Sequence, residues 1–164
     1  MAVNPYTHHM LTTRRATLED TELITRHRMA MFADAGSAPD PVLEQMARYF
    51  EPWVQRMIGE NRYAGWITSD GTRPIASAGL LMLDWAPHFL DPTGEQRGYI
   101  LNVFVEPEYR GRGLATMLTR ECIDEARQRG VGVVALHASK KGQPVYEKLG
   151  FTTSNEMLWV ETRS

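Results

Sequence analysis

An apolar segment that leads into a glycine-rich turn is the feature of this sequence that most constrains the fold. Residues 99–105 read Tyr-Ile-Leu-Asn-Val-Phe-Val, which is typical of a central strand in a sheet. The turn Arg110-Gly111-Arg112-Gly113 follows, and a helical repeat of apolar residues begins there. A further strand-like segment spans 131–138, so the chain between 99 and 138 predicts a parallel, right-handed strand–helix–strand unit.

The junction between that strand and its helix has the properties of an anion-binding site. The first N–H groups of a helix have no intrahelical acceptor, and the helix dipole adds partial positive charge. Glycine allows a ligand to approach the backbone closely. On these residues alone, an anion site and a plain tight turn remain equally open. The junction lacks the Gly-Lys-Ser/Thr ending of a P-loop and the third glycine of a dinucleotide fingerprint.

The rest of the chain predicts an α/β domain that alternates strands and helices. Thr17, followed by acidic residues, is typical of an N-cap, and Pro52 is expected to kink or divide the helix that contains it. Turn residues at 69–71 separate two strands. We expect strands at 11–16, 63–68, 75–85, 99–105, 131–138 and 151–161, and helices at 17–36, 42–60, 112–129 and 144–149.

Composition and charge exclude several classes of protein. The chain has 164 residues, a formal net charge of −2 and one cysteine, Cys122. A single cysteine cannot form an internal disulfide, and a nearly balanced charge gives no basic field for nucleic acid. The sequence also has no apolar run of about 20 residues, the length that crosses a membrane. We expect a cytoplasmic protein with residues 11–164 as a single domain. Residues 1–10 are expected to be a flexible leader or an added remnant, and the pair His8-His9 is not expected to bind metal because no third ligand is near it.

Two motifs together resemble the GNAT (GCN5-related N-acetyltransferase) superfamily. The stretch 102–115, Asn-Val-Phe-Val-Glu-Pro-Glu-Tyr-Arg-Gly-Arg-Gly-Leu-Ala, is similar to the family's Gln/Arg-x-x-Gly-x-Gly/Ala phosphate-binding signature. The stretch 144–151, Pro-Val-Tyr-Glu-Lys-Leu-Gly-Phe, is similar to its Tyr-x-x-x-Gly-Phe ending. The resemblance implies a mixed central sheet of about six to seven strands, with splayed parallel central strands and about four flanking helices.

The resemblance also implies a co-substrate, acetyl-CoA or another acyl-CoA, and no metal. Its pantetheine arm would pair with the backbone of the central strand, and amides of the turn and first helical residues would hold its pyrophosphate. Ser139 stands where the family often has asparagine. The implied cofactor-binding residues are Val103, Phe104, Val105, Arg110, Gly111, Arg112, Gly113, Leu114, Ala115, Thr116, Ser139 and Tyr146.

Two side chains are candidates for proton transfer when an amine attacks a thioester. Tyr146 aligns with the tyrosine that many family members use as general acid toward the CoA sulfur; the alternative is a core aromatic residue. His137 lies on the strand beside the expected cleft, and an imidazole titrates near neutral pH. A structural histidine, with a water chain in place of a dedicated base, remains the alternative. We expect Cys122 to be a buried small hydrophobe rather than a nucleophile.

The acceptor is expected to be a primary amine on a small molecule, attacked directly in a ternary complex. Asp84, Trp85 and Asn102 are the candidate residues for binding it, and acidic residues of the 84–98 loop hint at a cationic amine. A protein N-terminus or lysine is the alternative acceptor. A non-catalytic acyl-CoA-binding or interaction module and a different nucleotide-binding domain are the alternative functions. The apolar run 157–160 is either core or the contact of a homodimer.

Overall fold

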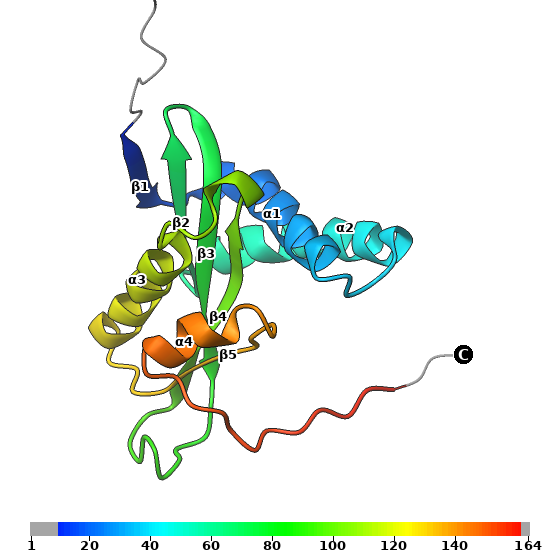
Figure 1. Cartoon of the computed structure of the whole chain (residues 1–164). Coiled ribbons are helices and arrows are strands. Elements are labelled where there is room, and N and C mark those ends of the chain that lie inside the picture. Colours follow the sequence, from blue (N-terminus) through cyan, green and yellow to red (C-terminus); the bar gives the residue numbers. More distant parts are fainter. Residues whose placement is uncertain (1–9, 162–164) are drawn as a thin grey trace, which may run out of the picture.

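Five strands form one mixed sheet in which only the last pair runs parallel. The computed structural model describes residues 10–161, and Figure 1 shows the sheet standing between two groups of helices. The strand order is β1-β2-β3-β4-β5, with antiparallel pairing up to β4 and parallel pairing between β4 and β5. The strands are β1 (Leu11–Arg15), β2 (Tyr63–Asp70), β3 (Arg73–Asp84), β4 (Gln96–Val105) and β5 (Val134–Leu136).

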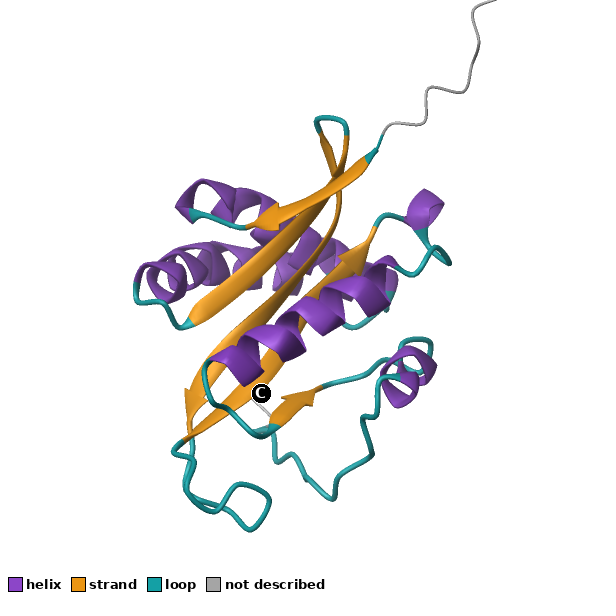
Figure 2. Ribbon diagram, turned by 90° about the vertical axis from the view of Figure 1, so that its left-hand side faces the viewer, coloured by secondary structure: helices purple, strands orange, loops and turns teal. Residues whose placement is uncertain are grey.

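Each face of the sheet has its own helices and its own apolar core. Helices α1 (Thr21–Asp34) and α2 (Asp40–Gly59) cover one face, and α3 (Leu114–Gln128) covers the other, as Figure 2 shows. The short α4 (Gln143–Lys148) lies beside α3. The core under α3 includes Leu80, Ile100, Leu118 and Cys122, and the core under α1 and α2 includes Ile24, Phe50, Val54, Met57 and Ile67. Cys122 is fully buried, as predicted.

Local capping explains where α1 begins. The Thr17 hydroxyl accepts the amide of Glu19, and the Asp20 carboxylate accepts the amide of Thr17. This reciprocal capping box closes the one-turn helix η1 (Leu18–Asp20), which leads into α1. The predicted N-cap at Thr17 is therefore confirmed. Pro52 lies inside α2 without dividing it.

A bulge in β4 changes which side chains reach the α1 face. The register against β3 shifts between Ser77 and Gly79, and Asn102 has a φ of +59°. Leu101 packs into the core under α1 and α2, and Asn102 bonds to a side chain of α1. Two neighbouring residues thus lie on one face, which a regular strand does not allow.

The parallel pair β4 and β5 is in contact over only a short length. Gly98, Tyr99 and Ile100 are the β4 residues that pair with β5. Beyond Ile100 no described strand pairs with this edge of β4, so the two central strands diverge toward the turn that starts α3. The predicted fold class, with splayed parallel strands and four α-helices, is confirmed.

The strand count is lower than the expected six to seven because the last expected strand is not formed. Residues 152–161 have no helix or strand, and β5 stops at Leu136 rather than reaching 138. Met157, Leu158, Trp159 and Val160 are 70–94% exposed, so the described chain provides no core for them. A strand that buries nothing is not stable alone. The core alternative for this run is wrong within the described chain, and the homodimer stays a prediction.

Two further expectations concern the ends of the chain and membranes. Residues 1–9, which hold most of the predicted leader and His8-His9, lie outside the described residues. Within the described range, no helix combines the length and apolar character that crossing a membrane requires.

Candidate active site

The turn after β4 presents a row of backbone amides without acceptors. Among the described residues, none accepts the N–H groups of residues 111–116, and the first bond into α3 runs from the amide of Met117 to the carbonyl of Gly113. Gly111 and Gly113 have φ values of +74° and +80°, a region that favours glycine. A Cβ at either glycine would meet no atom within 4 Å, so the backbone here is openly accessible. The arrangement fits an anion such as a pyrophosphate.

The two arginines of this turn do not lie free beside those amides. Arg110 donates from Nε to the carbonyl of Val105 at 2.8 Å and pairs with Asp34 at the end of α1. Its own amide bonds to the carbonyl of Pro107, so the open amides begin one residue later than the sequence predicted. Arg112 donates to the carbonyl of Glu108 and stacks on Tyr109 at 4.9 Å. The arginine side chains therefore shape the turn.

The second half of β4 provides the open edge that the sequence predicted. Val103 and Val105 are partly buried against the core under α3, whereas Phe104 is buried on the α1 face, 4.7 Å from the His27 ring. No described strand pairs with this edge beyond Ile100. An extended ligand arm can therefore pair with it, although the carbonyl of Val105 already accepts from Arg110.

Tyr146 lies on α4, at the side of the cleft that α3 covers. Its ring packs edge-on against Phe151, with centroids 6.0 Å apart and planes at 72°. Burial raises the pKa of its phenol, and among the described residues its hydroxyl has no hydrogen-bond partner. Tyr146 is thus a protonated phenol whose O–H is available.

His137 and Tyr99 meet where β4 and β5 begin to diverge. The Tyr99 hydroxyl and the Nδ1 atom of His137 form a short hydrogen bond. Burial is the main cause of the raised pKa of Tyr99. The structure therefore places the predicted His137 at the inner end of the gap between the strands, in contact with a tyrosine that the sequence did not single out.

Asn102 is the centre of a buried polar network. Its Oδ1 accepts from Nη1 of Arg28 at 2.7 Å, and its Nδ2 donates to the Tyr63 hydroxyl at 3.1 Å. Asn102 is 1% exposed, and burial raises the pKa of Tyr63. The phenol fits because position 79 is glycine: a Cβ there would lie 2.0 Å from the Tyr63 oxygen. Sequence reasoning found Asn102 but missed Arg28 and Tyr63, which carry no motif.

Beside this network, His27 and Ser77 form a second buried pair. The Nδ1 atom of His27 and the Ser77 hydroxyl are 2.7 Å apart. Burial lowers the pKa of His27 to about 4, so the imidazole is neutral at physiological pH. It adds no charge beside Asn102.

Ser139, the predicted cofactor contact after β5, has a local structural role. Its hydroxyl accepts the amide of Gly142, and its carbonyl accepts the amides of Gly142 and Gln143. These bonds shape the turn into α4 and engage the hydroxyl. A contact between Ser139 and a ligand remains a prediction.

Asp84 and Trp85 do not lie near Asn102. Asp84 pairs with Gln96 at the start of β4, six residues before Asn102, which corresponds to roughly 20 Å of strand. Asp84 is 3.6 Å from Arg62, and the Trp85 ring is covered by Arg97 at 4.6 Å. A shallow hollow at this loop is lined by Asp84, Trp85, Ala86, Pro87 and Glu95. The structure therefore does not bring these two residues together with Asn102, the other candidate for binding the acceptor.

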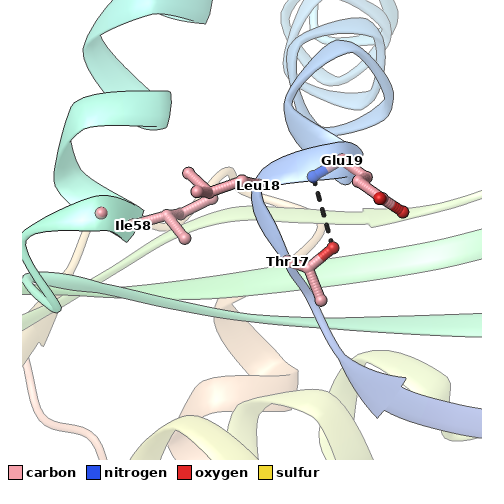
Figure 3. Close-up of a pocket in the computed structure, with 5 residues that line it drawn as sticks. Thr17, Leu18, Glu19 and Ile58 are labelled. Carbon is pink, nitrogen blue, oxygen red and sulfur yellow. Dashed lines mark hydrogen bonds between the residues drawn. The ribbon is translucent and has the colours of Figure 1, made fainter.

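Another shallow hollow lies between the start of α1 and the end of α2. Figure 3 shows Leu18 and Ile58 facing one another there, with Thr17 bonded to the amide of Glu19. These polar groups are the cap of η1, and no predicted site residue lines the hollow.

Comparison with known proteins agrees with this geometry. The model of the acetyltransferase (GNAT) family matches residues 27–151, which hold the open turn, Tyr146 and the bulge of β4. The chain belongs to this family. The resemblance found in the sequence is thereby confirmed.

Two solved structures are similar over nearly their whole length. A GCN5-related N-acetyltransferase from Ralstonia eutropha JMP134 is 34% identical, with a TM-score of 0.88, and the match covers 93% of this chain and 99% of that one. A predicted acetyltransferase from Clostridium acetobutylicum, solved with acetyl-CoA, is 31% identical, with a TM-score of 0.82 and coverage of 93% and 96%.

Curated relatives match over a smaller share of their length. Glucosamine 6-phosphate N-acetyltransferase of Trypanosoma brucei brucei is 43% identical over 65 residues, which are 40% of this chain and 44% of the relative. A mycothiol acetyltransferase of Nocardia farcinica is 29% identical over 157 residues, which cover 85% of this chain and 50% of the relative. The chain thus spans half or less of these relatives.

Acetyl-CoA is the co-substrate that this family implies, and the open amides at 111–116 fit its pyrophosphate. Over residues 10–161, no group of three or more His, Cys, Asp or Glu side chains is placed to hold a metal ion.

Proposed function

We propose that this protein is an acetyl-CoA-dependent N-acetyltransferase that acts on a small-molecule primary amine by direct attack in a ternary complex. The observation that carries the proposal is the row of amides without acceptors at 111–116, beside a β4 edge that no described strand pairs with. Amides 111–116 would hold the pyrophosphate, and the backbone of residues 103–105 would hold the pantetheine arm. When bound, acetyl-CoA supplies an acetyl group activated as a thioester.

Tyr146 has the properties of the general acid. A C–N bond forms between amine and acetyl carbon while the C–S bond breaks, and the departing sulfur takes a proton. The raised pKa keeps the phenol of Tyr146 protonated at neutral pH, and its hydroxyl donates to no described residue. The proton therefore passes from the Tyr146 oxygen to the sulfur, and solvent restores it.

His137 accepts the proton that the amine loses. Its Nδ1 atom is bonded to the Tyr99 hydroxyl. When Nδ1 carries the hydrogen and donates to the Tyr99 oxygen, Nε2 is left as a free acceptor. The raised pKa of Tyr99 keeps that phenol neutral. His137 serves as base in the tautomer in which Nδ1–H donates to the Tyr99 oxygen, whereas donation from the Tyr99 hydroxyl to Nδ1 leaves Nε2 protonated.

A small acceptor is supported by the named relatives. One curated relative acts on glucosamine 6-phosphate and another is a mycothiol acetyltransferase. A protein N-terminus or a lysine is the alternative, because another relative is an N-alpha-acetyltransferase of Schizosaccharomyces pombe. A screen that contains amines and peptides separates the two.

The experiment is a binding measurement joined to an amine screen. Acetyl-CoA is expected to bind in calorimetry and to raise the melting temperature, because a ligand of the folded state stabilises it. Release of free thiol with one class of amine then identifies the acceptor. Binding without transfer to any amine or peptide would favour a non-catalytic module, and a larger stabilisation by ATP would favour a nucleotide-binding domain.

A further inference from the structure

A half-buried positive charge lies between α1 and the bulge of β4, and it has no negative partner among residues 10–161. Arg28 lies on α1, and its guanidinium is held between the rings of Phe32 and Phe50, at 4.9 and 4.7 Å. Nη1 donates to Oδ1 of Asn102 at 2.7 Å, which fixes the guanidinium against the bulge of β4. Stacking on two rings and one polar bond thus hold this charge in a single orientation.

The charge of Arg28 is not balanced by the described chain. No ion pair of the described residues includes Arg28, and its buried Nε atom has no hydrogen-bond partner. Burial lowers the pKa of Arg28. A guanidinium removed from water without an anion is costly to the fold.

The position of Arg28 connects it to the proposed chemistry. Asn102, its partner, is the bulged residue of β4 and comes two residues after Ile100, the last residue of β4 that pairs with β5. Arg28 therefore approaches the divergence of β4 and β5 from the α1 face, whereas Tyr146 belongs to the side under α3. An acceptor that reaches the cleft from the α1 side meets Arg28.

The acidic loop does not oppose a negatively charged acceptor. Asp84 is 3.6 Å from Arg62, and Asp91 accepts the amide of Gly132 at 3.2 Å. Asp84 ends β3 and Asp91 lies on the loop between β3 and β4, so both are away from Asn102 along the strand. The hint of a cationic amine therefore finds no support at the cleft.

From these contacts we infer that Arg28 recognises an anionic group on the acceptor, so that the substrate is an amine that also carries a carboxylate or a phosphate. This inference rests on the proposed acetyltransfer function. Guanidinium groups match both anions with two parallel hydrogen bonds. Arg28 then selects the acceptor, while the amides at 111–116 hold the donor.

The test compares matched pairs of amines that differ in the anion alone. Amino acids are assayed against their amides, and glucosamine 6-phosphate against glucosamine, by thiol release with acetyl-CoA. In at least one pair, kcat/KM for the anionic member is expected to exceed that of its neutral partner by tenfold or more. The pair that shows it distinguishes a carboxylate from a phosphate.

Variants of Arg28 then assign the preference to this side chain. Arg28→Gln is expected to reduce the ratio of anionic to neutral kcat/KM at least tenfold. Arg28→Lys keeps the positive charge but not the planar guanidinium with its two parallel donors, and it is expected to reduce the ratio less. If Arg28→Gln fails to fold, the ratio measured for Arg28→Lys tests the same assignment. Arg26→Gln is the matched control, because Arg26 lies on the exposed side of the same helix and should keep the ratio.

Two outcomes separate failure of this inference from failure of the proposed function. Acetylation of neutral and anionic partners with equal efficiency, or a ratio unchanged in both Arg28 variants, would overturn the inference and leave acetyltransfer standing. Absence of acetyl-CoA binding and of thiol release with every amine would overturn both.

Discussion

Arg15 of β1 and Glu125 of α3 are joined by two hydrogen bonds, from Nη1 at 2.7 Å and from Nη2 at 3.0 Å. Arg15 also covers the Trp66 ring at 4.6 Å, and Glu125 accepts a third bond from Nε of Arg129 at 2.8 Å. These contacts fasten an edge strand, whose five residues are all exposed, to the helix that opens the proposed cofactor site.

This pair predicts a loss of stability in acid. The bonds from Arg15 are the main cause that lowers the pKa of Glu125 from 4.5 to about 2. A lowered pKa in the folded state gives stability that is complete above the unfolded value and is lost as pH falls from about 4.5 toward 2. We expect Glu125 to account for roughly 2 kcal/mol of that loss, measured by urea unfolding of the wild type and Glu125→Gln between pH 7 and 3.

The difference in the free energy of unfolding between the wild type and Glu125→Gln isolates the contribution of Glu125. Asp20, whose pKa is lowered by Arg14, titrates in both proteins and therefore cancels. Glu22→Gln is the control, because Glu22 is exposed and lies 3.7 Å from Arg26. This variant should follow the wild-type curve. Parallel curves for the wild type and Glu125→Gln would contradict the assignment.

Gly79→Ala tests whether a missing side chain makes room for the Tyr63–Asn102 bond. A Cβ at position 79 would lie 2.0 Å from the Tyr63 oxygen and 2.2 Å from its Cζ atom. Tyr63 is 3% exposed and cannot move without displacing Asn102. We expect a loss of about 1–3 kcal/mol in the free energy of unfolding, together with lower acetyltransferase activity.

Gly59→Ala is the matched control for that prediction. Gly59 ends α2, and a Cβ there would meet no atom within 4 Å. Alanine is a better helix former than glycine, so the variant should be unchanged or more stable by up to about 1 kcal/mol. An equal effect of the two substitutions in urea unfolding would refute the role given to Gly79.

Sequence patterns predicted the elements whose signals are local. The Thr17 cap, the 63–84 hairpin and the β4–turn–α3 junction all formed where apolar spacing, turn residues and glycines placed them. The expected strand at 151–161 failed for a non-local reason. Its β propensity is strong, but pairing needs a neighbouring strand, and β5 stops at Leu136.

The residues of the candidate site also divide into those that a local pattern predicts and those that it does not. The open amides at 111–116 and Tyr146 were predictable because each belongs to a motif with a fixed spacing. Arg28, Tyr63 and Tyr99 were not, because they meet Asn102 and His137 only after α1, β2 and β4 pack together. The acceptor-binding role of Asp84 and Trp85 stays a prediction, and the pairing of Asp84 with Gln96 places it six residues of strand away from Asn102.

Cys122 is expected to resist thiol reagents in the folded protein. Its side chain is fully buried under α3, and burial raises the pKa of the thiol, which suppresses the reactive thiolate. Native protein should react with an aromatic disulfide reagent far more slowly than protein in urea, which should release one equivalent because the chain has one cysteine. Fast labelling without urea would contradict the burial. Slow labelling also means that Cys122 does not disturb a thiol-release assay.

Tyr146→Phe separates acid catalysis from packing. The substitution removes the hydroxyl but keeps the ring that packs edge-on against Phe151 at 6.0 Å. We expect kcat to fall by about 10²–10⁴-fold, with little change in acetyl-CoA affinity by calorimetry or in melting temperature. The matched control is Tyr49→Phe, because Tyr49 lies on α2 and is 74% exposed; it should leave kcat unchanged.

The pH profile adds a readout that packing alone would not move. The raised pKa of Tyr146 means that its phenol stays protonated throughout the neutral range. Wild-type activity should therefore have no alkaline loss from this residue below about pH 10. If Tyr146→Phe keeps wild-type kcat at pH 7–9, the proton reaches the sulfur from elsewhere and Tyr146 is a packing residue. If kcat falls while acetyl-CoA binding persists, the free O–H of Tyr146 is the group that protonates the leaving thiolate.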